Sequence, residues 1–135
     1  MTSTGVRDGL LAFYDAFDTH DPQEFAARLS ESEGVSVIGS APGEGHEGRT
    51  AWIDAYTNGI AAAGIKLVTG GDARGWQLGE AGFALDEPSF VLPDGSRLQT
   101  RLTAVLARED SQWRIVHLHF SVGVPDEAAL ENSER

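Results

Sequence analysis

Apolar side chains recur three and four positions apart at the start of the chain, at Val6, Leu10, Phe13, Tyr14 and Phe17. Positions with this spacing lie on one face of an α-helix. The pattern therefore predicts an amphipathic helix over residues 4–19, with its aromatic face turned toward the core.

Two further helices are predicted downstream. One begins at "DPQE", where Asp21 can cap the helix, Pro22 suits its first turn and Glu24 completes a capping-box-like arrangement; Gly34 is expected to end it. A short strand at residues 35–38 and a glycine-rich loop, "GSAPGEGHEG", lead to the third helix, "RTAWIDAYTNGIAAAG". Four apolar residues share one face of this helix: Trp52, Ile53, Tyr56 and Ile60. Gly64 lies where a C-terminal cap is expected.

From Ile65 onward the hydrophobic period changes to two, which is typical of half-buried strands. Strands are predicted at residues 65–69, 73–78, 82–92, 98–108 and 113–122, with turns at "GG", "GE", "PDGS" and "EDSQ". Helices followed by antiparallel strands predict an α+β fold, in which three N-terminal helices pack on one face of a curved sheet. We expect residues 1–125 to form a single domain and the acidic residues 126–135 to form a mobile tail.

The last predicted strand, "WRIVHLHFSVGVP", carries two histidines and a serine at alternate positions. Strict alternation divides such a strand into two faces. The more apolar face is expected to cover the core: Arg114, Val116, Leu118, Phe120 and Val122. The other face is too polar for the core of a monomer and too apolar for plain solvent, so we expect it to join two copies of the chain in a homodimer: Trp113, Ile115, His117, His119 and Ser121.

Length and composition narrow the class of protein. The 135 residues, 41% of them hydrophobic, suffice for one compact core. The 10 Lys and Arg residues against 21 Asp and Glu give a net charge of −11, so nucleic acid and membrane surfaces are not expected as partners. The chain lacks cysteine, a signal-peptide pattern and a run of about 20 apolar residues, which indicates a cytoplasmic protein.

Two segments carry a resemblance to a known family. The order of elements, the loop and helix in "VIGSAPGEGHEGRTAWIDAY" and the final strand "WRIVHLHFSVGVP" resemble the nuclear transport factor 2-like superfamily over residues 5–125, specifically its SnoaL-like and ketosteroid-isomerase-like members. The final strand is also similar to the end of the association domain of calcium/calmodulin-dependent protein kinase II. The resemblance implies a conical α+β fold that encloses a pocket and forms a dimer through the outer face of its sheet.

The two histidines of the last strand are also candidate metal ligands. Neutral imidazole binds zinc, copper and iron, and His117 and His119 lie on one face of the predicted strand. No carboxylate follows them, since the next positions are Ser121, Val122 and Gly123, and the chain has no cysteine to complete a site. We therefore expect no metal and no cofactor.

The acid–base residues of ketosteroid isomerases match this chain only in part. The resemblance implies an oxyanion-hole tyrosine, for which Tyr14 is the candidate, a base near Gly39 and Ser40, and a protonated Asp on the strand that contains Ala104. No carboxylate stands at the last two places, so ketosteroid isomerisation is not expected. Tyr14 can serve equally well in core packing or in ligand contact.

Asp86 is the strongest remaining candidate for acid–base chemistry. It lies in "GFALDEP", where alternation and Pro88 allow two positions, one facing the cavity and one at an edge bulge. If Asp86 faces inward, desolvation is expected to raise its pKa and fit it for proton transfer.

The remaining candidates are pocket residues, for which ordinary core packing is the alternative: Trp52, Tyr56, Trp76, Phe120 and His46. Together these features predict a SnoaL-like protein that binds a small, partly hydrophobic molecule in an internal cavity. An acid–base reaction of the isomerase, cyclase or hydrolase type is one expectation for that cavity. The alternative is a non-catalytic dimeric binding or assembly module that resembles the kinase association domain.

Overall fold

The computed structural model describes residues 1–133. Its helices are α1 (Thr4–Asp18), α2 (Pro22–Ala27), α3 (Arg49–Ala55), the π-helix η1 (Tyr56–Ala61) and α4 (Asp126–Ser133). Its strands are β1 (Ser36–Ile38), β2 (Gly45–Glu47), β3 (Lys66–Val68), β4 (Arg74–Leu78), β5 (Ala81–Asp86), β6 (Ser89–Val91), β7 (Arg97–Gln99), β8 (Arg101–Glu109) and β9 (Gln112–Ser121). The predicted α+β fold class is confirmed.

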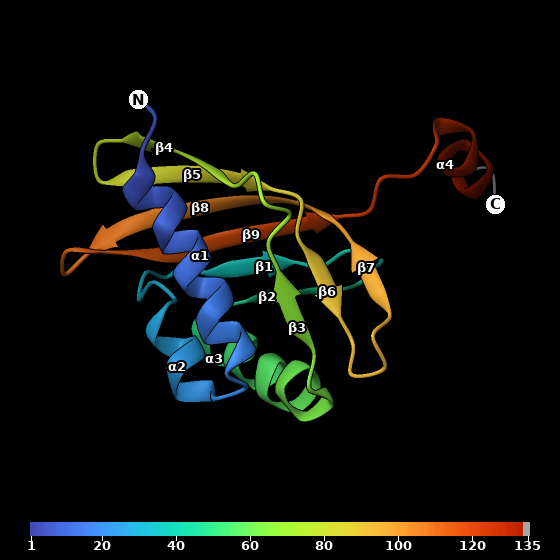
Figure 1. Cartoon of the computed structure of the whole chain (residues 1–135), viewed down its shortest axis with the longest axis horizontal. Helices are drawn as coiled ribbons and strands as arrows, with labels where there is room; N and C mark the ends of the chain where they lie inside the picture. The colour runs from blue at the N-terminus through green and yellow to red at the C-terminus, as the bar shows by residue number, and fades with distance from the viewer. Residues whose placement is uncertain (134–135) are drawn as a thin grey trace.

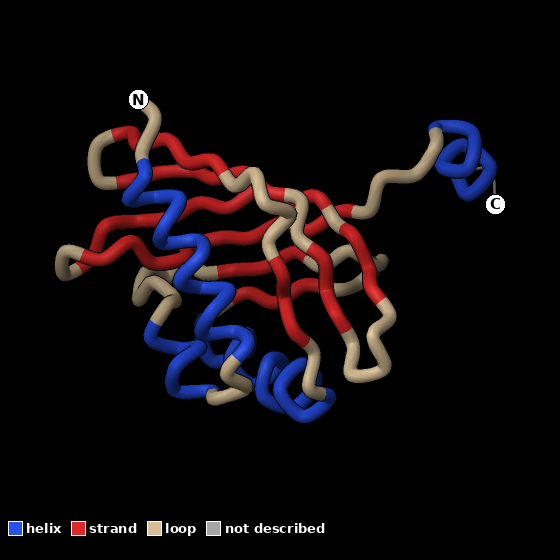
Figure 2. Tube along the Cα trace, in the orientation of Figure 1, coloured by secondary structure: helices blue, strands red, loops and turns tan. Residues whose placement is uncertain are grey.

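Two sheets form the body of the domain. One has six strands in the order β2-β1-β9-β8-β5-β4, in which only β1 and β9 pair in parallel, and the other has the order β3-β6-β7. In Figure 1 the strands of the smaller sheet run steeply relative to those of the larger sheet, and α1 lies across the larger sheet. Figure 2 shows that the N-terminal helices gather on one side of the larger sheet, while α4 stands apart at the end of an extended segment.

Helix α1 approaches the larger sheet closely because glycines face it. A Cβ atom on Gly75 of β4 would lie 2.7 Å from the backbone nitrogen of Arg7, and one on Gly82 of β5 would lie 2.6 Å from Val6. On the helix itself, a Cβ on Gly9 would lie 2.7 Å from the Cβ of Trp113. These contacts leave no room for a side chain, so the small residues set the distance between helix and sheet.

A single bent hairpin joins the two sheets. β5 continues through Glu87 and Pro88 into β6, and β7 continues through Thr100 into β8. Pro88 has no backbone N–H for the ladder, and its carbonyl oxygen accepts hydrogen bonds from the backbone nitrogen and Oγ1 of Thr100, both at 2.9 Å. The continuous strands predicted over residues 82–92 and 98–108 are therefore wrong, because the bend divides each of them between two sheets.

A β-bulge interrupts the alternation of β9. Val105 pairs with His117, whereas the next residue of β8, Leu106, pairs with Ile115, so Val116 is the extra residue. One extra residue turns all side chains on one side of it to the opposite face. Strict alternation along this strand is therefore a wrong prediction.

Because of the bulge, the five residues predicted for the dimer interface do not all lie on one face of β9. Ile115 is fully buried and Trp113 packs against α1, so both belong to the core side. Alternation then places Arg114, which lies between them, on the opposite face. Beyond the bulge, Leu118 and Phe120 are buried as predicted. The outer face of the sheet keeps only three of the five predicted residues: His117, His119 and Ser121.

Three other segments differ from the sequence prediction. The second helix ends at Ala27 rather than near Gly34, because Leu29 forms a parallel bridge to Ile115. Residues 45–47, expected in a loop, form β2 beside β1, and the third helix widens into a π-helix at Tyr56. The tail that was expected to be mobile contains α4, and its residues 134–135 lie outside the described part of the chain.

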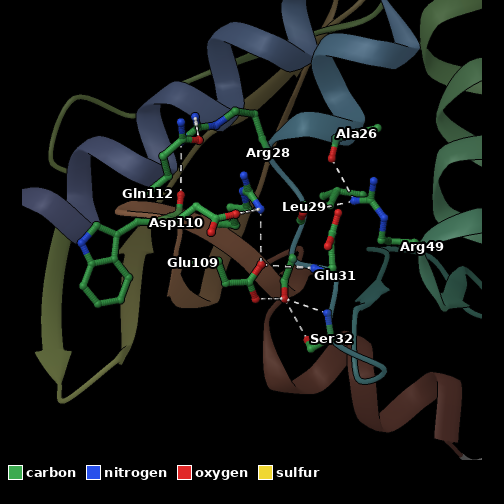
Figure 3. A network of polar contacts seen from close by, with 12 residues as sticks. Ala26, Arg28, Leu29, Glu31, Ser32, Arg49, Glu109, Asp110 and Gln112 are labelled. Atoms are coloured by element: carbon green, nitrogen blue, oxygen red, sulfur yellow. Dashed lines mark hydrogen bonds and ion pairs between the residues drawn. The ribbon is translucent and has the colours of Figure 1, made fainter.

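Polar contacts hold the end of α2 against the hairpin of β8 and β9 (Figure 3). The Arg28 guanidinium donates to the carbonyl oxygen of Trp113 at 3.2 Å and to Oε1 of Gln112 at 3.5 Å. The fully buried hydroxyl of Ser30 donates to the carboxylate of Glu109. Burial, and then the nearby charge of Arg114, lower the pKa of Arg28. These contacts fix the segment that precedes β1.

The close approach of α1 can be tested with two identical glycine substitutions in helices. Gly9→Ala is expected to destabilise the fold by about 1–3 kcal/mol, because the new methyl group overlaps Trp113. Gly59→Ala is the matched control, since nothing lies within 4 Å of its added Cβ, and it is expected to be neutral or stabilising by up to about 1 kcal/mol. Urea unfolding of both variants measures the difference. Equal stability of the two variants would contradict the packing described here.

Candidate functional site

A cavity of about 400 Å³ lies between the two sheets and the helices. Its walls come from α1, β1, α3, η1, β9 and the smaller sheet, and most of them are apolar. The aromatic residues that line it are Phe13, Phe17, Trp52, Tyr56, Phe90 and Phe120. The volume falls in the range of small-molecule pockets, which are also lined mainly by apolar and aromatic side chains.

The aromatic wall is held in place by contacts behind it. The ring of Tyr56 stacks on Phe25 with centroids 3.9 Å apart and an interplanar angle of 5°. The Tyr56 hydroxyl donates to the carbonyl oxygen of Phe17 at 2.6 Å, so it is already engaged. Phe90 of the smaller sheet meets Phe120 of β9 at a centroid distance of 4.9 Å. The cavity is therefore bounded by rings whose orientations are fixed by packing.

Polar groups line the cavity at the turn between β1 and β2. Ser40, Glu44 and His46 are the polar side chains there, and all three belong to the glycine-rich loop or to β2. The turn folds back so that Gly39 donates its backbone N–H to the carbonyl oxygen of Glu44 at 2.8 Å. Oε1 of Glu44 accepts from the backbone nitrogen of Ala41, also at 2.8 Å. A carboxylate thus lies beside Gly39, where sequence reasoning found none.

Asp86 lies at the bend between the sheets and is 5% exposed. Its Oδ2 accepts hydrogen bonds from the Tyr14 hydroxyl at 2.9 Å and from Thr69 Oγ1 at 2.8 Å. Its Oδ1 accepts from the backbone nitrogens of Glu87 at 2.8 Å and Gly70 at 3.2 Å. Four donors therefore compensate this carboxylate for its lost hydration.

Tyr14 serves this carboxylate as a hydrogen-bond donor. Burial raises the pKa of Tyr14 well above its ordinary range, and the charge of Asp86 and the hydrogen bond to it raise that pKa further. The phenol therefore stays protonated and keeps its donor role. Neither Tyr14 nor Asp86 is among the described residues that line the cavity.

Comparison with known proteins adds to this geometry. A model of the SnoaL-like domain matches residues 6–125. This chain belongs to the SnoaL-like domain family. The family predicted from the loop before α3 and from the final strand is thereby confirmed. A comparison with curated proteins finds no matching relative.

Solved structures with this fold come from several bacteria. An NTF2-like protein of unknown function from Pseudomonas putida has a TM-score of 0.76 and 16% identity, and the match covers 95% of this chain and 94% of that one. A provisionally assigned dehydratase of the NTF2-like family from Streptomyces avermitilis has a TM-score of 0.73 and 17% identity, and the match covers 90% of this chain and 95% of that one. A provisionally assigned calcium/calmodulin-dependent protein kinase II association domain from Xanthomonas campestris has a TM-score of 0.70 and 18% identity, and the match covers 84% of this chain and 82% of that one. The TM-scores establish a shared fold, and at identities of 16–18% the likeness shows the fold alone.

The cavity of this SnoaL-like protein includes four of the five residues predicted from sequence for the pocket: Trp52, Tyr56, Phe120 and His46. Trp76 is not among the lining residues. Because Gly75 faces α1, alternation along β4 turns Trp76 to the outer face, where it stacks on Phe83 with centroids 5.0 Å apart. The position of Trp76 in the pocket was therefore a wrong prediction.

Sequence reasoning missed Glu44 and the rings contributed by α1 and β6. Phe13 and Phe17 were assigned to the core of the SnoaL-like fold, and they both pack in the core and line the cavity. The sequence signal for Glu44 was the Pro42-Gly43 pair, which favours a tight turn that returns the chain toward Gly39.

The outer-face histidines of this SnoaL-like protein lie away from the cavity. Nδ1 of His117 is 2.9 Å from the Ser36 hydroxyl, and His119 pairs with Ile38 of β1. Within residues 1–133, no three His, Cys, Asp or Glu side chains gather as metal ligands would. No helix in the same part of the chain is long and apolar enough to cross a membrane.

The Asp86 contacts predict coupled losses of stability. Asp86→Asn should lower the free energy of unfolding by about 2–4 kcal/mol, because an amide cannot accept from all four donors, and Tyr14→Phe by about 1–3 kcal/mol. The double variant should lose less than the sum, since the two residues share a hydrogen bond. Asp72→Asn, on an exposed residue, is the control. Urea unfolding measures the unmodified chain and all four variants, and strictly additive losses would argue against the contact.

Proposed function

We propose that this SnoaL-like protein binds a small, largely apolar molecule in the cavity between its two sheets. The observation that carries the proposal is the cavity itself, which is about 400 Å³ in volume and is walled by six aromatic rings. Apolar surface of this kind gains free energy when a ligand displaces water from it. Ser40, Glu44 and His46 supply polar groups that can orient the ligand at one side.

Binding is supported better than acid–base catalysis by the groups that line the cavity. An acid–base site needs ionisable groups within hydrogen-bond reach of the bound molecule. The sequence favoured Asp86 with Tyr14 for this role, but their hydrogen bonds are made to each other and to Thr69, Gly70 and Glu87. Those contacts support a role in holding the bend. An isomerase, cyclase or hydrolase reaction in the cavity would instead use Glu44 or His46.

Filling the cavity provides a direct test. Ala55 lines the cavity, whereas Ala51, one turn earlier in α3, is exposed and does not. Naphthylmethanol is a neutral aromatic probe of suitable size, and calorimetry measures its affinity. Ala55→Phe is expected to weaken binding at least about tenfold, because the new ring occupies the site. Ala51→Phe should bind like the unmodified chain.

Two results would contradict this proposal. One is the absence of any binding of naphthylmethanol to the unmodified, folded chain. The other is equal affinity in Ala55→Phe and Ala51→Phe, which would locate the probe outside the cavity.

A second candidate function is that of a dimeric assembly module, joined through the outer face of the larger sheet. One row of side chains crosses five strands on that face: Ser36, His117, Val105, Phe83 and Trp76. Phe83 is 38% exposed and Val105 is 41% exposed, so the middle of the row is apolar and open. The fold shared with the provisionally assigned association domain from Xanthomonas campestris also supports this candidate. A homodimer would cover the row together with His119 and Ser121.

Val105→Glu tests the homodimer. A charge in the middle of the row should be buried without a partner, and it is expected to convert a dimer to a monomer at micromolar concentration. Val124→Glu is the matched control, because Val124 is 56% exposed and lies beyond β9. Light scattering after size-exclusion chromatography measures the mass. A monomeric unmodified chain, or a Val105→Glu variant that remains a dimer, would contradict this candidate.

A cytoplasmic location and the absence of nucleic-acid and membrane partners complete the proposal. The net charge of −11 supports the second part, because it opposes binding to phosphate backbones and anionic lipid. A chain without cysteine suits a reducing compartment.

A further inference from the structure

We propose that the cavity selects apolar amines over apolar carboxylates of the same shape, and that Glu44 sets this preference. The inference rests on the proposed function, because it names the charge class of the ligand for the same cavity. It goes beyond that function by assigning specificity to one residue of the turn between β1 and β2.

The formal charge of the cavity lining is negative. Among the described residues that line it, Glu44 is the only Asp or Glu, and no Lys or Arg is present. Oε1 of Glu44 accepts the backbone N–H of Ala41, and no donor in the described part of the chain hydrogen-bonds Oε2. One carboxylate oxygen is therefore available to a ligand.

The Glu44 side chain is held at this position by the turn. Its backbone carbonyl accepts the N–H of Gly39, and a Cβ on Gly39 would lie 2.6 Å from the Cβ of Glu44. The glycine thus lets the side chain pack directly on the backbone of residue 39. A carboxylate fixed at both ends loses less conformational entropy when it binds a cation than a freely rotating one would.

In the described part of the chain, no Lys or Arg forms an ion pair with this carboxylate. Arg49 is the Lys or Arg closest to Glu44 in the sequence, but its guanidinium donates to the carbonyl oxygens of Ala26 at 2.9 Å and Leu29 at 3.1 Å. Figure 3 shows Arg49 directed at these two carbonyl groups. Among the described residues, none of the ion pairs includes Glu44.

The aromatic walls favour the same class of ligand. The faces of aromatic rings carry partial negative charge and attract cations. A molecule with an apolar body and an amine can place its body among the rings and its ammonium group beside Glu44, which is exposed at the rim. The ammonium group then keeps part of its hydration, so the cost of burying charge stays small. A carboxylate in the same position would meet Glu44 with no cation to balance it.

Three matched probes test the inference by calorimetry at about pH 8: naphthylmethanol, naphthylmethylamine and naphthoate. The unmodified chain is expected to bind the amine about tenfold more tightly than the carboxylate, a preference typical of one partly exposed charge that attracts the first and repels the second. Glu44→Gln keeps the acceptor for Ala41 and removes the charge, so the two affinities should become nearly equal. Glu47→Gln, on an exposed residue of β2 outside the lining, is the control with the same change in net charge and should keep the preference.

The outcomes separate this inference from the proposed function. If naphthylmethanol binds but the amine and the carboxylate bind equally to the unmodified chain, the charge selection is wrong and the cavity remains a binding site. If the preference persists in Glu44→Gln, or disappears equally in Glu47→Gln, then Glu44 is not its source and the assignment is overturned. If none of the three probes binds, the proposed function fails together with the inference.

Discussion

A buried carboxylate at the bend between the two sheets is the interaction on which the rest of this structure depends. Asp86 ends β5 where Glu87 and Pro88 interrupt the ladder, and it accepts hydrogen bonds from α1 and from the loop after β3. A buried carboxylate without donors would cost several kcal/mol, so the donors and the bend require each other. Because α1, β3 and β5 meet at this one group, the smaller sheet keeps a fixed direction relative to the larger one.

The cavity exists because the smaller sheet is turned away from the direction of the larger sheet. If β5 and β6 continued as one straight strand, Phe90 would lie in the larger sheet and could not face Phe17 of α1. The bend instead places the smaller sheet opposite the helices, and the space between them is lined by rings that cannot fill it. Among the described lining residues, Ser40 and Glu44 come from the turn between β1 and β2 and His46 comes from β2. The carboxylate that organises the fold and the carboxylate at the cavity are therefore different residues. This separation allows Glu44 to be changed without loss of the bend.

The sequence predicts most of the fold and part of the site, and the failures have local physical causes. The helical spacing from Val6 to Phe17 and the period of two after Ile65 identify the helices and strands because burial dictates both patterns. Alternation failed in β9, since the extra residue Val116 leaves no mark in the hydrophobic pattern. It failed again at Pro88, where the bend depends on Thr100 and on the donors to Asp86 from Tyr14 and Thr69, which are distant in the sequence. Glu44 was missed because its place beside Gly39 depends on how the turn closes.

The proposed function locates the binding of a small apolar molecule in the space between the sheets and on no outer surface. The most direct measurement is a titration of the isotope-labelled, full-length chain with naphthylmethanol, followed in backbone amide NMR spectra. We expect the largest shifts in η1, in the turn between β1 and β2 and in β6 and β7, with the outer-face residues of β5 and β8 unaffected. Shifts that gather instead around Phe83 and Val105, or spectra that do not change at saturating probe, would contradict the proposed function.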